Sequence, residues 1–113
     1  MFVPNILLFL FMLIYNTTYH CEQACYDEFV EWLRKEYIPV AVQHGAISAP
    51  RMSRILGHED NEGVSLSLQF STADFDALSA WYDACGATLV ASLEKNFQQR
   101  VVGFSTIMQE IDL

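Results

Sequence analysis

Basic residues are scarce in this sequence. Six Lys and Arg stand against 14 Asp and Glu in 113 residues, which gives a net charge of −8 at pH 7. So large an excess of negative charge repels the phosphate backbone of nucleic acids, which proteins bind mainly through Lys and Arg. We therefore expect no nucleic acid among the partners of this protein.

The sequence also lacks a hydrophobic run long enough to cross a bilayer. The apolar run 6–15 is about half of the roughly 20 residues that a transmembrane helix needs. No Lys or Arg precedes Arg34, and no small residues mark a cleavage site before Cys21, which disfavours a secretory signal. We predict a cytoplasmic protein that does not contact membranes. Residues 1–11 form an apolar N-terminal extension, which an overlong gene start would explain. The alternative is an envelope-associated protein held through residues 6–15.

The sequence contains few cysteines, and their number is odd. Three cysteines favour free thiols in a reducing compartment. His20, Cys21 and Cys25 place three metal-binding side chains within six residues, but their spacing matches no common zinc motif. We predict no bound metal and no cofactor. The chain also has no Gly-rich phosphate loop and no Ser-His-Asp set, so its residues do not decide whether it is an enzyme.

The chain does contain a regular succession of strand-like and helix-like periods. Its β-like segments are 12–20, 47–56, 64–70 and 101–112, and its helical segments are 26–40 and 75–97. The order β-α-β-β-α-β predicts one α+β domain, residues 12–113, with the ferredoxin-like fold. In this fold two helices cover one face of a four-stranded antiparallel sheet. The other face is then free to meet solvent or a second copy.

Hydrophobic spacing predicts which side chains are buried. The expected stripe of the first helix is Tyr26, Phe29, Val30, Leu33, Tyr37 and Val40, and that of the second is Phe75, Leu78, Tyr82, Gly86, Leu89, Leu93 and Phe97. Pro39 should kink the first helix and Gly86 can bend the second. Ser71 or Thr72 is the expected cap of the second helix. In 64–70 apolar residues alternate with Ser65, Ser67 and Gln69, so one sheet face is apolar and the other small and polar.

Several stretches carry a family resemblance: Glu31-Trp32-Leu33 with Ile38-Pro39, the segment 50–56, and 104–107 with Glu110. They resemble the domain-of-unknown-function 4286 family of small bacterial proteins, and the likeness extends from Met12 to the C-terminus. The resemblance implies a dimeric α/β barrel of ferredoxin-like subunits with no established activity. Related barrels include cofactor-independent monooxygenases, dehydratases and haem-handling enzymes. The family usually has a histidine where this chain has Tyr37 and an arginine where it has Ser105.

A candidate ligand pocket follows from the kink at Pro39, which should lift the end of the first helix from the sheet. We assign to it Trp32, Tyr37, His44, Arg51 and Arg54. An arginine could bind a carboxylate ligand. Residues three apart on a strand face opposite sides, however, so only one of the two arginines can point into a given pocket. Trp32 and Trp81, on the helix flanks, are more often packing residues than ligand contacts.

The sequence therefore favours a non-catalytic homodimeric binding module. The alternative is a small cofactor-independent or haem-linked dimeric α/β-barrel enzyme that acts on a small organic ligand. A cavity beside Tyr37 is the feature that bears most on the choice.

Overall fold

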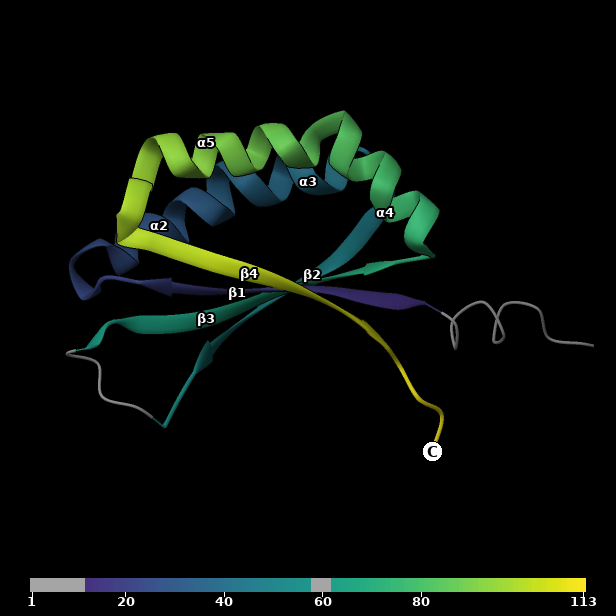
Figure 1. Cartoon of the computed structure of the whole chain (residues 1–113), viewed down its shortest axis with the longest axis horizontal. Helices are drawn as coiled ribbons and strands as arrows, with labels where there is room; N and C mark the ends of the chain where they lie inside the picture. Colours follow the sequence, from purple (N-terminus) through teal and green to yellow (C-terminus); the bar gives the residue numbers. More distant parts are fainter. Residues whose placement is uncertain (1–11, 58–61) are drawn as a thin grey trace, which may run out of the picture.

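A computed structural model describes residues 12–57 and 62–113 (Figure 1). Its four strands are β1 (Leu13–Cys21), β2 (Ile47–Ile55), β3 (Val64–Thr72) and β4 (Val101–Gln109). They form one antiparallel sheet in the order β2-β3-β1-β4, which confirms the predicted ferredoxin-like fold. The predicted extension, residues 1–11, and residues 58–61 of the β2–β3 connection lie outside the described residues.

Both helices lie on the same face of this sheet (Figure 1). The first runs through η1 (Gln23–Cys25), α2 (Tyr26–Trp32), η2 (Leu33–Tyr37) and α3 (Ile38–Gln43). The second runs through α4 (Phe75–Trp81), η4 (Tyr82–Gly86), α5 (Ala87–Phe97) and η5 (Gln98–Arg100). Over the described residues, no helix has the length and apolar character to span a membrane.

Each helix contains one π-helical turn, η2 in the first and η4 in the second. Pro39 has no N–H to donate to the carbonyl four residues earlier, and its ring crowds that carbonyl. The wider turn η2, which ends just before it, relieves this conflict. The turn η4 ends at Gly86, where an added Cβ would lie 2.6 Å from Cζ3 of Trp81. Gly86 is therefore the residue that lets the indole pack against the helix backbone.

The π turns shift the buried face of each helix by one residue. An α-helix rotates by about 100° per residue, and a π turn accommodates one residue more than an α turn. The first helix consequently buries Ala41, whereas the predicted Val40 is 42% exposed. In the second helix Trp81 is fully buried, whereas Phe75 is 63% exposed and Tyr82 is also exposed. The predicted stripes were wrong at these three positions because they assumed an uninterrupted α-helical period.

Aromatic side chains fill the core between sheet and helices. The ring of Phe29 meets Tyr19 at 5.1 Å and Phe97 at 5.2 Å, both edge to face. The indole N–H of Trp81 donates to the carbonyl of Ala41 at 2.9 Å and so joins the two helices inside the core. The apolar row of β3 is buried and faces this core, as its alternation predicted.

The second helix is capped by Asp74. Its carboxylate accepts a hydrogen bond from the Ala77 N–H at 2.8 Å. The predicted caps, Ser71 and Thr72, belong instead to β3, and the Thr72 hydroxyl donates to the Ala46 carbonyl at 2.9 Å. The cap prediction was wrong because β3 is two residues longer than its alternating apolar pattern.

Candidate functional site

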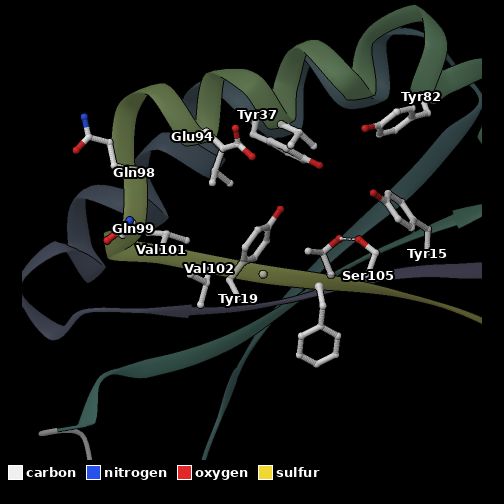
Figure 2. A pocket seen from close by; sticks show the side chains of 15 residues that line it. Tyr15, Tyr19, Tyr37, Tyr82, Glu94, Gln98, Gln99, Val101, Val102 and Ser105 are labelled. Carbon is white, nitrogen blue, oxygen red and sulfur yellow. Dashed lines mark hydrogen bonds between the residues drawn. The ribbon is translucent and has the colours of Figure 1, made fainter.

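A cleft of about 710 Å³ opens between α5 and the edge strand β4, with β1 as its floor (Figure 2). Its aliphatic walls include Val90 and Leu93 of α5 and Val101 of β4. Glu94, Gln98 and Gln99 add polar groups. The cleft therefore combines apolar walls with a small number of polar groups, the usual composition of a ligand site.

Four tyrosines contribute to this cleft from both layers of the fold. Tyr15 and Tyr19 alternate on β1 and point toward the helices, whereas Tyr37 and Tyr82 extend from the helices toward the sheet (Figure 2). Tyr37 is the last residue of η2 and Tyr82 is the first of η4. Each π turn thus supplies one tyrosine, in keeping with the frequent occurrence of π turns at functional sites.

Gly103 makes room for one of these tyrosines. The β1–β4 register places it opposite Tyr19. A Cβ at Gly103 would lie 2.8 Å from Cδ1 and 3.1 Å from Cε1 of the Tyr19 ring. Because glycine has no Cβ, the Tyr19 ring can lie directly over β4 while its hydroxyl faces the cleft (Figure 2).

Burial keeps the central phenols protonated. It raises the pKa of Tyr19 to about 12, and the nearby hydroxyls of Tyr37 and Thr17 offset only part of this effect. Burial also raises the pKa of Tyr37, and its proximity to Tyr19 raises it further. Both groups can therefore donate hydrogen bonds throughout the neutral pH range.

The raised pKa of Tyr19 makes stability depend on alkaline pH. The unfolded chain releases this proton near the ordinary value of 10.0, whereas the folded protein holds it until about pH 12. Between these values the folded state binds more protons than the unfolded state, so the free energy of unfolding should fall as pH rises. Urea unfolding from neutral pH to about pH 11 should show this fall and a shallower one in Tyr19→Phe. Identical pH profiles in the two proteins would contradict the assignment.

The cleft continues along β4 beneath α4. A second hollow of about 410 Å³, lined by Phe75, Leu78 and Ile107 among others, shares Tyr15, Tyr82 and Ser105 with the first. At this junction Ser105 is hydrogen-bonded to the hydroxyl of Thr17 at 3.0 Å. Ser105 and Tyr37, the two positions at which the family resemblance implied a departure, therefore both line the cleft.

Of the five residues assigned to a pocket from sequence, Tyr37 alone lines this cleft. Trp32 does not line the cleft. Its ring lies 5.8 Å from that of Tyr37 and packs on Phe29 and Phe97 in the core. His44 is exposed just beyond α3. The structure thus brings Trp32 and Tyr37 together and leaves His44 outside the cleft.

The two arginines lie on β2, the edge of the sheet opposite β4. Arg51 pairs with Gln69 on the face away from the helices, and Arg54 pairs with Leu66 on the helix side. Arg54 lies over the Tyr26 ring at 5.4 Å. As the strand alternation predicted, the two side chains do not point into a common pocket.

Sequence reasoning missed Tyr15, Tyr19, Tyr82, Glu94 and Gly103. Two signals were present in the sequence. Hydroxyl-bearing residues alternate along β1, and Gly103 lies inside a strand, where glycine often marks the close approach of another group to the backbone. Neither signal identifies its partner, because the approach of α5 to β4 is set by the tertiary fold.

The His20 side chain does not meet the thiols of Cys21 and Cys25 at a common point, because it lies on the opposite face of the sheet from Cys21. The nitrogens of the His20 ring lie 2.9 Å from the Ser65 hydroxyl and 2.9 Å from the Glu62 carbonyl. Cys21, its neighbour on β1, faces the core, and burial raises the pKa of its thiol to about 11. Within residues 12–57 and 62–113 no cluster of three His, Cys, Asp or Glu side chains could hold a metal ion.

Comparisons with known proteins support the fold. The family described as "Domain of unknown function (DUF4286)" matches residues 12–111. No curated protein matches the sequence. A NIPSNAP family protein of unknown function from Agrobacterium tumefaciens has a TM-score of 0.68 at 14% identity and covers 92% of each chain.

Two further solved structures are similar. A monooxygenase of Streptomyces coelicolor, in complex with nanaomycin D, has a TM-score of 0.60 at 10% identity, over 92% of this chain and 90% of its own. A dimeric ferredoxin-like protein from an uncultured marine organism has a TM-score of 0.54 at 11% identity, and the match covers 90% of this chain and 97% of that protein. At such low identity these likenesses show the fold alone.

Proposed function

This chain belongs to the DUF4286 family, whose function is unknown, and we propose that it is a homodimeric module that binds a small organic molecule in the cleft between α5 and β4. The observation that carries the proposal is the approach of four tyrosines, from two strand positions and two π turns, to one apolar cleft (Figure 2). Its volume of about 710 Å³ is in the range of small-molecule sites.

A cofactor-independent enzyme acting on the same ligand is the second candidate function. The protonated phenols of Tyr19 and Tyr37 favour it, because such groups can stabilise an oxyanion that forms on a substrate. A haem-linked enzyme is less well supported, since the side chains that line the cleft within the described residues include no Lys or Arg to pair with haem propionates. Ligand consumption, as opposed to simple retention, would establish catalysis.

The binding proposal is tested by a thermal-shift screen of acids, quinones and haem. A ligand that binds the folded state raises the melting temperature. Val90→Trp, which fills the cleft from α5, should abolish the shift. Val40→Trp is the matched control, because Val40 is 42% exposed and Val90 38% exposed, but Val40 does not line the cleft. Equal shifts in both variants would place the ligand elsewhere.

The free face of the sheet supports the homodimer. None of the 14 acidic residues falls within the four strands, although the net charge is −8. Across this face run small polar side chains such as Ser67, and an apolar strip on β4 consists of Val102, Phe104 and Met108. Two copies can therefore meet here without opposing carboxylates and can bury the strip. A chain of this size gains stability from such extra burial.

Replacing Phe104, which is 65% exposed, by aspartate should dissociate this dimer. The change introduces opposing charges into an otherwise acid-free face and removes apolar contact area. Light scattering at micromolar concentration should report about twice 12.9 kDa for the unchanged protein and 12.9 kDa for Phe104→Asp. Val40→Asp, on the outer face of α3, should remain dimeric. A monomeric parent protein, or dissociation by both substitutions, would contradict the sheet-face dimer.

A further inference from the structure

The charge distribution of the cleft disfavours anionic ligands. Among the described residues that line it, Glu94 carries the one carboxylate and no Lys or Arg is present. Two basic residues elsewhere, Arg34 and Lys35, pair with Glu31 on the surface at 2.8 Å and 3.2 Å. A carboxylate or phosphate in the cleft would therefore face Glu94 without a compensating cation.

The hydrogen-bonding groups of the cleft favour a neutral acceptor. Tyr19 and Tyr37 stay protonated at neutral pH and present their hydroxyls to the cavity from opposite layers (Figure 2). A phenol O–H donates to an uncharged carbonyl oxygen without the desolvation cost that a buried anion incurs. Because the Tyr37 hydroxyl donates to the Tyr19 oxygen, the Tyr19 O–H is left to donate to the oxygen of a ketone or quinone.

The walls favour a flat ring. The Tyr19 ring lies over β4 where Gly103 has no side chain, and it is one of the residues that line the cleft. Val90 and Leu93 of α5 form the facing apolar wall. An aromatic ring between them can pack against the Tyr19 ring in an offset or edge-to-face arrangement.

We propose that the cleft selects neutral aromatic ketones and quinones, whose carbonyl oxygen accepts from Tyr19, a hydroxyl oriented by Tyr37, while the ring packs between Tyr19 and the α5 wall. This inference rests on the proposed binding function and names its ligand class. Glu94 acts as the element that discriminates against carboxylated analogues.

Three related probes test the ligand class on the full chain: fluorene, 9-fluorenone and 9-fluorenone-4-carboxylate. Isothermal titration calorimetry should show 9-fluorenone binding about tenfold more tightly than fluorene, the equivalent of one hydrogen bond of about 1.4 kcal/mol. The carboxylate should bind at least about tenfold more weakly than 9-fluorenone, and Glu94→Gln should reduce that difference.

Tyr19→Phe should lower the affinity for 9-fluorenone to that for fluorene, and Tyr37→Phe, which removes the group that orients the Tyr19 hydroxyl, should lower it by a smaller factor. Fluorene binding to each variant shows that the cleft has remained intact, and Tyr26→Phe, outside the cleft, is the matched control. Equal affinities for fluorene and 9-fluorenone in the unchanged protein, or tightest binding of the carboxylate, would overturn the ligand class and leave the binding function standing. If none of the three probes binds, both proposals fail.

Discussion

Replacing Trp81 by alanine is expected to lower the free energy of unfolding by about 3–5 kcal/mol. The side chain is fully buried, its N–H donates to the Ala41 carbonyl, and its ring contacts Tyr15 edge to face at 5.6 Å. Alanine would leave a cavity between the two helices and a buried carbonyl without its donor. Urea denaturation followed by circular dichroism measures the change.

Phe75→Ala provides the control for this prediction. Phe75 is also an aromatic residue of α4, but it is 63% exposed, so its removal should cost less than about 1 kcal/mol. The two losses are therefore expected to differ by several fold. Similar losses for both variants would contradict the account of Trp81 as the residue that joins the helices.

Substituting valine for Gly103 should destabilise the protein by about 1–3 kcal/mol and also close the cleft. The new Cβ would lie 2.8 Å from Cδ1 of Tyr19 and 3.3 Å from the Thr18 carbonyl oxygen. The strand backbone is fixed by pairing with β1, so the Tyr19 ring must move into the cavity. Any ligand of the cleft should then lose at least about tenfold in affinity.

Thr106→Val tests whether this effect is specific. Thr106 lies on the same strand but on the face away from the helices, opposite Asn16. Valine has nearly the shape of threonine, so stability and ligand affinity should stay close to those of the parent protein. A Gly103→Val protein that is as stable as Thr106→Val and binds ligand normally would show that Tyr19 does not need the space.

The strands and their order could be predicted from sequence because the alternation in 64–70 and the β-like segments on either side of the helices are local signals. The helix faces were predicted only in part. Pro39 and Gly86 indicated irregularity, but neither residue reveals that the chain adopts a π turn there in place of a bend. Val40 was therefore expected in the core position that Ala41 occupies.

One residue, Tyr37, is common to the pocket expected from the sequence and the cleft in the structure. Its other tyrosines come from β1 and η4, and only the tertiary packing of α5 against β4 brings them together. The arginines were chosen for their chemistry, which suits carboxylates, and β2 places them at the far edge of the sheet. Side-chain chemistry can suggest what a site binds, but the strand order decides which residues meet.

The two π turns lengthen the spacing between buried residues on each helix. Leu33 and Ala41 share one buried face, yet they are separated by one residue more than two regular helical turns, and the same holds for Trp81 and Leu89. Each helix is therefore one residue longer, at its π turn, than a regular α-helix with the same buried faces. The additional residue also sets which side of each helix faces the cleft, so the two insertions decide that Tyr37 and Tyr82 line it.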